Sequence, residues 1–218
     1  MTTITKPRLG IIGGTGDLGS GLAKAWVAAG YEVIIGSRNK ERAVEAASGI
    51  GGAASGATNA EAAAACDVAI LAVPFSSHES SLLEIRDAMQ GKILVDAVVP
   101  LVPPKVSVVQ LPSEGSAAVI ARRILGDAVR VVSAFHNVGA AKLHAGGKVE
   151  CDVLVFSDDK EARAAVIELA GAIANRGVSG GALANSAAAE AMTSVLIWIN
   201  RTYKVPGAGI SITGLSTT

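Results

Sequence analysis

The sequence has few of the residues from which metal centres, disulfide frameworks and membrane spans are built. Its 218 residues include two cysteines, Cys66 and Cys151, which lie far apart and outside any C-x-x-C or Cys/His spacing. Each is therefore expected to be a small buried apolar residue. No apolar run reaches the roughly 18 residues that span a bilayer, and residues 1–8 lack the apolar stretch of a secretion signal. We expect a cytoplasmic protein with no metal site and no membrane partner.

Net charge and aromatic residues are also scarce. Nineteen Lys and Arg residues balance nineteen Asp and Glu residues, so no overall field attracts nucleic acid, and we expect no nucleic-acid partner. Only 3% of the residues are aromatic although 50% are hydrophobic, so the core must consist of Ala, Val, Ile and Leu. Such a core suits parallel strands that are buried on both faces.

A glycine-rich turn follows the first apolar run, residues 9–12. Gly14, Gly16 and Gly19 complete the pattern G-x-G-x-x-G. In dinucleotide sites these glycines make a tight turn, let the backbone approach a pyrophosphate and let the helix pack on the strand. A helix ending at Gly30 and a strand at 31–35 follow, and this context favours a nucleotide site over a plain glycine-rich loop. The expected cofactor-binding residues here are Gly14, Thr15, Gly16, Asp17, Leu18 and Gly19.

The end of the second predicted strand indicates which nucleotide binds. An NAD site usually has Asp or Glu there, whereas an NADP site has small donors and an Arg. This chain has Ser37 and Arg38, with no carboxylate to repel a 2′-phosphate, and both side chains can donate to one. NADP is favoured. The alternative is that Arg38 belongs to a solvated helix that begins near Asn39.

Strands and helices alternate through the rest of the chain. A capping box at Thr58 and Glu61 opens a short helix, and the same signature at Ser76 and Glu79 opens another that runs to about residue 90. Residues 49–56 are expected to be a surface loop. Further strands are predicted at 68–73, 93–95, 106–109, 129–133 and 151–156, and further helices at 113–125 and 159–175.

This order predicts an α/β fold, a Rossmann-type doubly wound parallel sheet with a small helical C-terminal segment. We expect residues 1–157 to form an NADP-binding Rossmann domain and residues 158–218 to form a helical segment for capping and dimerisation. The predicted final helix, 184–203, has an apolar stretch at 192–199 that suits packing over the sheet edge or against a second subunit. We therefore expect a homodimer.

Ligands of such sheets bind beyond the carboxyl ends of the strands, which selects the segments 73–76, 96–103 and 133–137. Pro74 and Phe75 form an apolar wall beside the nicotinamide, or else they only end a strand and fill the core. The expected cofactor-binding residues in these segments are Val73, Pro74, Phe75, Val98, Pro100, Ala134 and His136.

His136 is the candidate catalytic residue, because it follows a strand end while His78 and His144 fall in predicted helices. The alternative is a structural hydrogen bond. Asp96 also follows a strand end, but it has no neighbour in the sequence that makes a recognisable dyad.

Four motifs make the chain resemble the NADPH-dependent reductases of the deazaflavin coenzyme F420. They are residues 13–19 with 21–23, Gly36-Ser37-Arg38, Pro100-Leu101-Val102-Pro103 and Ser133-Ala134-Phe135-His136-Asn137, with weaker similarity at 113–114, 116–118, Asn185 and 190–193. The resemblance implies that NADP lies on the glycine loop and that the deazaflavin stacks on the nicotinamide, so that hydride passes directly between the rings. Such chemistry depends on positioning and needs no nucleophile or metal.

The chain departs from the family pattern at Gly115 and at Ala182, Ala184 and Ala187, where family members often carry arginine. These cations would contact the anionic tail of the deazaflavin coenzyme. The hydride acceptor is therefore open between coenzyme F420 and an imine, a ketone or a flavin. A pyrroline-carboxylate-type reductase and a non-catalytic NADP-binding protein are the other classes that fit the sequence.

Overall fold

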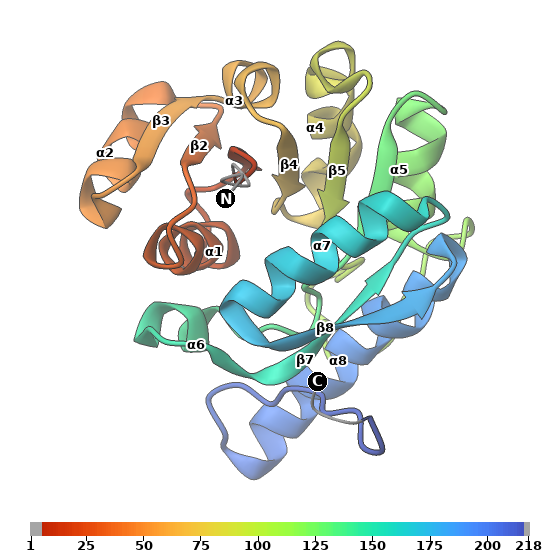
Figure 1. The fold of residues 1–218 in the computed structure, drawn as a ribbon. Coiled ribbons are helices and arrows are strands. Elements are labelled where there is room, and N and C mark those ends of the chain that lie inside the picture. Colours follow the sequence, from red (N-terminus) through yellow and green to blue (C-terminus); the bar gives the residue numbers. More distant parts are fainter. Residues whose placement is uncertain (1–5, 216–218) are drawn as a thin grey trace.

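One sheet organises the chain, which the computed structural model describes from residue 6 to residue 215. Within those residues the sheet has eight strands in the order β3-β2-β1-β4-β5-β6-β7-β8 (Figure 1). The strands are β1 (Leu9–Ile12), β2 (Val33–Ser37), β3 (Ala54–Thr58), β4 (Val68–Leu71), β5 (Ile93–Asp96), β6 (Arg130–Ser133), β7 (Val149–Phe156) and β8 (Ala174–Gly181). The chain order of the strands reverses between β1 and β4, which is where open α/β sheets bind their ligands.

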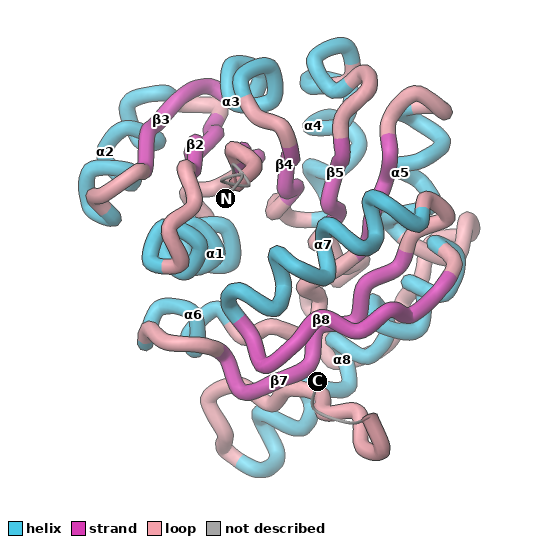
Figure 2. The backbone as a smooth tube through the Cα atoms, in the orientation of Figure 1, coloured by secondary structure: helices cyan, strands magenta, loops and turns pink. Residues whose placement is uncertain are grey.

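Helices cover both faces of the sheet, as Figure 2 shows for the cyan segments around the magenta strands. They are α1 (Asp17–Ala28), α2 (Lys40–Ile50), α3 (Asn59–Ala65), α4 (His78–Ile85), α5 (Ala117–Leu125), α6 (Ala140–Ala145), α7 (Lys160–Ile173) and α8 (Ser186–Tyr203). Side chains of α1, α2 and α7 share one hydrophobic core, and those of α3, α4 and α5 share the other. The doubly wound Rossmann-type fold expected from the sequence is confirmed.

The strands supply both cores because successive side chains point to opposite faces. In β4, Val68 and Ile70 belong to the first core, whereas Ala69 and Leu71 belong to the second. Strands that are buried on both faces read as continuous apolar runs. This is why the central strands were predictable from the sequence.

Two strands at the sheet edges were not predicted, because small residues rather than apolar runs form them. β3 lies partly in the segment 49–56 that was expected to be a loop, and a Cβ on its Gly56 would stand 2.3 Å from the backbone nitrogen of Val44 in α2. β8 follows α7 directly, and a Cβ on its Gly177 would stand 2.6 Å from the carbonyl oxygen of Ile167. In both places glycine permits a helix to pack directly on strand backbone.

The sheet is also not wholly parallel. Strands β3 to β6 pair in parallel, but β7 pairs antiparallel with β6 at Ser133 and Phe156, and β8 is parallel to β7. The segment 158–218, expected to be helical, contains β8 as well as α7 and α8. The C-terminal segment therefore extends the sheet in addition to covering it.

Some helices begin or end at residues other than those predicted from the sequence. The capping box of Thr58 and Glu61 is confirmed, with Glu61 N–H donating to Thr58 Oγ1 at 3.2 Å and Thr58 N–H donating to Glu61 Oε2 at 2.9 Å. The signature at Ser76 and Glu79 does not cap a helix, because a 3₁₀ turn, η1 (Phe75–Ser77), precedes α4. α4 ends at Ile85 rather than near residue 90, and residues 106–109 form no strand.

The helix α8 and the residues after it pack against the rest of the molecule through polar contacts. Glu190 of α8 accepts the backbone N–H groups of Ala117 and Ala118, the first residues of α5, at 2.7 and 3.3 Å. Beyond α8, the Asp152 carboxylate binds both the Arg176 guanidinium and the backbone N–H of Ile212. These contacts attach the C-terminal residues to the sheet.

Candidate functional site

The glycine turn between β1 and α1 has the close contacts that its glycines permit. Gly13 adopts φ of +77°, and the Gly14 N–H donates to the carbonyl oxygens of Ile11 and Gly36 at 3.1 and 2.9 Å. A Cβ on Gly19 would stand 2.8 Å from the Gly14 Cα. Any side chain there would push α1 away from the turn, so the loop sequence sets how closely the helix approaches the strand.

The amino end of α1 is available to an anion. Its N-cap is Gly16, and no side chain caps the helix. The first N–H groups of a helix lack intrahelical partners and carry partial positive charge, which suits a phosphate. A Cβ on Gly16 would meet nothing closer than 3.6 Å, so the backbone itself forms the surface that a ligand meets. The loop therefore fits the pyrophosphate of a dinucleotide.

A polar groove of about 320 Å³ runs from this loop to the end of β2. Ser37 is 8% exposed, and its Oγ accepts the N–H of Asn39 at 3.2 Å, which leaves the hydroxyl hydrogen free to donate. Arg38 lines the same groove, as predicted. A second guanidinium, that of Arg42, joins it and was missed by the sequence analysis.

Arg42 reaches the groove because of a helix cap. The Asn39 side chain accepts the Arg42 N–H at 2.8 Å and so fixes the first turn of α2 at the end of β2. An Asn followed three residues later by Arg was the signal available in the sequence. Ser37, Arg38 and Arg42 together provide donors for a 2′-phosphate.

An apolar cavity of about 520 Å³ continues from this groove, and both are lined by Gly16, Ala72, Val73 and Pro74. One wall is the turn after β4, with Val73, Pro74 and Phe75. The facing wall is the loop after β5. It contributes the predicted Val98, then Leu101 and Pro103 from the segment 96–103 that the sequence selected, and Val106, which the sequence analysis missed. Volumes of 300–1,000 Å³ are typical of sites for small molecules.

His136 lines the cavity from the loop after β6. It is 6% exposed, its Nε2 lies 3.0 Å from Ser133 Oγ, and its Nδ1 has no protein partner. Burial lowers the pKa of His136 to about 4, although the charge and the backbone carbonyl of Asp96 act in the opposite direction. The imidazole is therefore neutral at physiological pH, and its Nδ1 is a buried polar atom without a hydrogen-bond partner in the protein.

The backbone before His136 has an unusual conformation. Phe135 adopts φ of +71°, which is uncommon for a residue with a side chain. Such conformations concentrate at functional sites, where surrounding packing holds them. On the other side, Thr193 of α8 lines the cavity and donates its Oγ1–H to the His136 carbonyl oxygen at 2.9 Å.

Asp96 has a partner that the sequence did not reveal. Its Oδ2 lies 2.7 Å from His78 Nε2, and its Oδ1 accepts the Val98 N–H at 3.0 Å. Both side chains are buried behind the two walls of the cavity. The interpretation of Asp96 as a residue without a dyad partner was wrong, because the contact depends on the adjacency of β4 and β5.

Most of the predicted site residues line the groove or the cavity, and a few do not. Those that line the groove or the cavity are Thr15, Gly16, Asp17, Leu18, Ser37, Arg38, Val73, Pro74, Phe75, Val98 and His136. Gly14 and Gly19 shape the loop from within. Pro100 and Ala134 line neither space, since both are buried and the Ala134 N–H donates to the Asp96 carbonyl oxygen.

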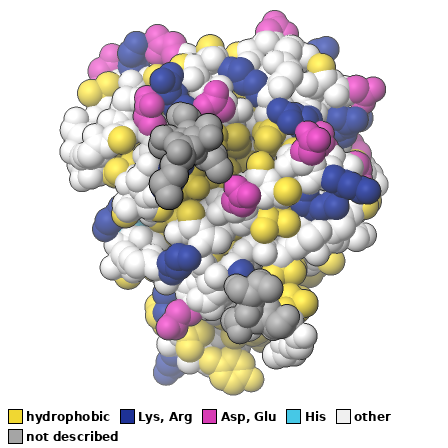
Figure 3. All heavy atoms as spheres, in the orientation of Figure 1, with side chains coloured by type: hydrophobic (Ala, Val, Ile, Leu, Met, Phe, Trp, Pro, Cys, Tyr) yellow, Lys and Arg dark blue, Asp and Glu magenta, His cyan; other side chains and the backbone are white. Residues whose placement is uncertain are grey.

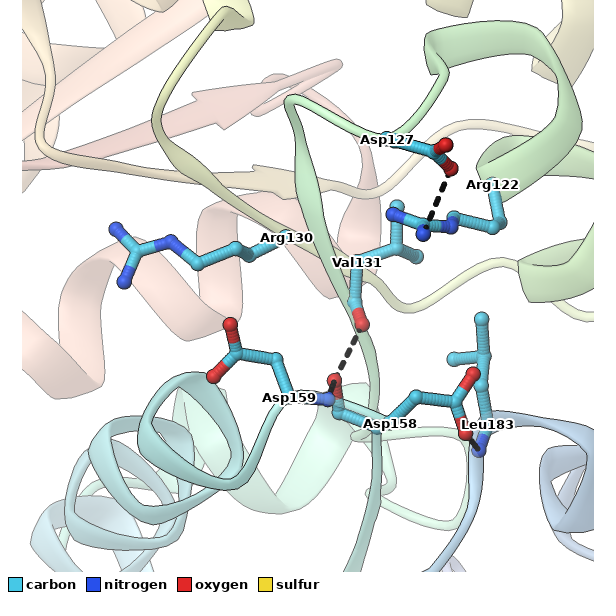
Figure 4. Close-up of a pocket in the computed structure, with 8 residues that line it drawn as sticks. Arg122, Asp127, Arg130, Val131, Asp158, Asp159 and Leu183 are labelled. Carbon is cyan, nitrogen blue, oxygen red and sulfur yellow. Dashed lines mark hydrogen bonds and ion pairs between the residues drawn. The ribbon is translucent and has the colours of Figure 1, made fainter.

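Another cavity, of about 310 Å³, lies away from this site, and Figure 4 shows its lining residues. It adjoins Arg130 at the amino end of β6, whereas His136 follows the carboxyl end of the same strand. Arg122 pairs with Asp127 at 2.9 Å, and the Asp158 carboxylate accepts the Leu183 N–H at 3.1 Å. Because protein groups already bind these charges, this cavity is not the candidate site.

Neither a metal cluster nor a membrane span is found in the part of the chain that the structure describes. Among residues 6–215 no group of three or more His, Cys, Asp or Glu side chains is placed to hold a metal ion. No helix among those residues is long and apolar enough to cross a membrane. Cys66 and Cys151 are both buried free thiols, as expected.

The reversed strand order, the open helix terminus and the groove leading into an apolar cavity define a dinucleotide-binding protein of the Rossmann type. Residues 8–100 match the family described as "NADP oxidoreductase coenzyme F420-dependent". The chain is 42% identical to the F420-dependent NADP reductase of Methanothermobacter marburgensis, over 95% of this chain and 99% of that protein. It is 39% identical to the reductase of the same name from Methanocaldococcus jannaschii, with the same coverage. The chain belongs to the F420-dependent NADP reductase family.

A solved structure shares the fold. It is a putative F420-dependent NADP reductase from Arthrobacter sp. FB24, with a TM-score of 0.81 and 22% sequence identity. The match covers 95% of this chain and 99% of that one. Almost all of this chain therefore shares the architecture of that protein.

Proposed function

We propose that the protein is an oxidoreductase that transfers hydride between NADP(H) and coenzyme F420. The observation that carries the proposal is the continuity of the polar groove, with its two guanidinium groups, and the apolar cavity. Membership of a family in which two relatives at about 40% identity are named F420-dependent NADP reductase supports it. When bound, NADPH supplies a hydride from its nicotinamide to the deazaflavin, and one proton completes the reduction.

The residues of the groove bind and orient the nucleotide. The amino end of α1 holds the pyrophosphate, while Ser37, Arg38 and Arg42 hold the 2′-phosphate. The groove then directs the nicotinamide toward Val73 and Pro74, which line both spaces. The expected preference for NADP thus depends on Arg42 as well as on the two residues found from the sequence.

The residues of the cavity position the rings and exclude water. Apolar side chains on both walls suit flat rings that stack on each other, and correct alignment lowers the barrier to direct transfer. His136 is neutral because of its lowered pKa, so it acts as a hydrogen-bonding and positioning group at the ring edge rather than as a charged acid.

An anaerobic assay with purified protein, NADPH and oxidised coenzyme F420 tests the function. We expect the deazaflavin absorbance to be lost at a rate proportional to the enzyme concentration, and NADH to be a much poorer donor. Reduction of a cyclic imine, a ketone or a flavin without loss of deazaflavin absorbance would instead identify another acceptor. Nucleotide binding without reduction of any acceptor would identify a non-catalytic NADP-binding protein.

The second candidate, a reductase of an uncharged acceptor, is favoured by one observation. Among the described residues that line the cavity, none is Arg or Lys. The anionic tail of coenzyme F420 therefore has to lie outside the cavity, whereas a neutral imine or ketone would be enclosed by it. Parallel assays with these acceptors decide between the two.

We also propose that α8 forms a homodimer interface within the segment 158–218. Exposed apolar side chains lie on α8 and on the loop after β5, and Ser194 of α8 donates to the Val108 carbonyl oxygen of that loop at 3.4 Å. Figure 3 shows hydrophobic side chains gathered at the lower tip of the molecule, where Figure 1 places the end of α8. A cytoplasmic location is part of the same proposal, because the reaction uses the NADPH pool of the cell.

A further inference from the structure

A buried side-chain pair connects the two walls of the apolar cavity. His78 begins α4 immediately after η1, which carries Phe75 of the first wall. Asp96 ends β5 and is followed by Val98 of the second wall. The His78 Nε2 to Asp96 Oδ2 distance is 2.7 Å, and the two side chains are 2% and 1% exposed. Neither residue lines the cavity, so the pair lies behind both walls.

Each partner also holds its own wall. The His78 ring lies 5.9 Å from the Phe75 ring, with the two planes tilted by 31°. On the other side, Asp96 Oδ1 accepts the backbone N–H of Val98 at 3.0 Å. One carboxylate therefore binds the first wall through His78 and the second wall through Val98.

The Asp96 carboxylate is buried, and a buried carboxylate without hydrogen-bond donors strongly destabilises a folded protein. Here both carboxylate oxygens have a donor. Parallel pairing of β4 and β5 already aligns Leu71 with Asp96, so the strand ends need no side-chain bond. What the pair adds is a connection between the turn and the loop beyond those ends.

We propose that His78 and Asp96 are positioning residues that fix the separation of the cavity walls and thereby the alignment of the hydride donor and acceptor. This inference rests on the proposed hydride transfer. Neither side chain lines the cavity, so they act through Phe75 and Val98. A displacement of about 1 Å between reacting groups is enough to lower a rate by about a hundredfold.

Two variants separate hydrogen bonding from charge. In Asp96→Asn, the side-chain oxygen still accepts from Val98, and the amide N–H donates to His78 in its other tautomer. The double variant His78→Leu/Asp96→Asn cuts the bridge without leaving a buried charge. Asp152→Asn is the matched control, because Asp152 is a buried carboxylate that binds Arg176 and Ile212 away from the cavity.

We expect Asp96→Asn to stay within about threefold of the wild-type kcat, and the double variant to lose about tenfold or more. KM for the acceptor should rise in the double variant, while the Kd of NADP⁺ for the free enzyme stays within about twofold, because Ser37, Arg38 and Arg42 lie outside the two connected segments. The control should lose thermal stability without changing KM for the acceptor. His78→Leu cuts the same bridge and provides the test if the double variant does not fold.

Hydrogen exchange of the free protein gives a readout that needs no substrate. Peptides covering 72–78 and 97–103 should exchange faster in the double variant, whereas those covering 33–37 should not change. Unchanged exchange together with unchanged kinetics would overturn the proposal. Equal losses in Asp96→Asn and the double variant, with a shifted pH profile, would also overturn it in favour of a role for the charge. If the wild type does not reduce coenzyme F420, the proposed function fails, but the exchange experiment still decides whether the pair connects the walls.

Discussion

Trp26 and Phe135 pack edge to face, with ring centroids 5.3 Å apart and planes at 89°. Trp26 lies on α1, which begins at the glycine turn, and Phe135 precedes His136 of the cavity. Both rings are fully buried. The contact therefore packs the loop that carries His136 against α1, next to the glycine turn.

Phe135→Ala should destabilise the protein and lower the rate. Removal of a buried phenyl ring costs about 3 kcal/mol or more in the free energy of unfolding. The loop should also shift, because nothing else of that size fills the space. Urea denaturation and turnover measured on the folded variant check both effects. A rate equal to wild type in a destabilised but folded variant would show that His136 is positioned without this contact.

The nucleotide preference should be carried by both arginines of the groove. We expect NADP(H) to bind at least about tenfold more tightly than NAD(H), which corresponds to about 1.4 kcal/mol. Arg38→Ala should remove most of the preference, and Arg38→Ala/Arg42→Ala should abolish it, with the Kd of NAD⁺ nearly unchanged. Calorimetry with both nucleotides measures this. Arg130→Ala, in the separate polar cavity, is the control, and equal affinities for the two nucleotides in the wild type would refute the prediction.

The pH dependence of the reaction should lack a histidine inflection near neutrality. Since burial lowers the pKa of His136 to about 4 from the usual histidine value of 6.5, the ring should stay neutral between about pH 5 and pH 8. Because its pKa is lower in the folded than in the unfolded protein, His136 makes a contribution to the free energy of unfolding that is fully present above pH 6.5. This contribution is lost as the pH falls toward 4. His136→Ala should lower kcat by about tenfold to a hundredfold through misalignment, without abolishing turnover. A wild-type kcat profile with an inflection near pH 6.5 that disappears in His136→Ala would contradict this.

The parts of the site that could be predicted from the sequence are those that depend on local order. Gly14, Gly19, Ser37 and Arg38 each follow directly from a strand end or a helix start. The central strands were predictable because burial on both faces makes them continuously apolar. A single sequence carries this information without any knowledge of the partner segments.

The residues that were missed depend on contacts between distant segments. His78 and Asp96 meet only because β4 and β5 are neighbours, and Thr193 reaches the cavity only because α8 folds back over it. β8 was missed for a related reason, since its glycines are explained by the close approach of α7 and by the Phe156 ring. Such pairings have no periodic signal in the sequence.

Glu190 should make stability depend on pH. Burial raises the pKa of Glu190 to about 7 from the usual value of 4.5; the two backbone N–H groups of α5 act to lower this pKa, and the Asp96 charge acts to raise it. A raised acid pKa means that the folded state binds the proton more tightly, so the contribution to stability is fully present below pH 4.5 and is lost as the pH rises through 7. Glu190→Gln has no carboxyl group at this position to titrate. The free energy of unfolding of this variant relative to wild type should therefore rise by about 3 kcal/mol between pH 4 and pH 8. Urea denaturation at both pH values measures the difference, and the same difference at both would contradict the prediction.

Assembly through α8 gives the last prediction. Val195 and Trp198 are 42% and 60% exposed on this helix, and a large apolar surface of this kind is more stable between subunits than in water. Val195→Glu/Trp198→Glu should therefore shift the protein from dimer to monomer at micromolar concentration, as measured by sedimentation velocity. Val44→Glu is the control, since Val44 is 46% exposed on α2 and should not affect assembly.

A chain that ends before Ala184 should be insoluble or strongly destabilised, because it also loses the contacts of Glu190 with α5. A monomeric wild type together with a folded, soluble truncated chain would show that α8 is a cap for the cavity and not an interface.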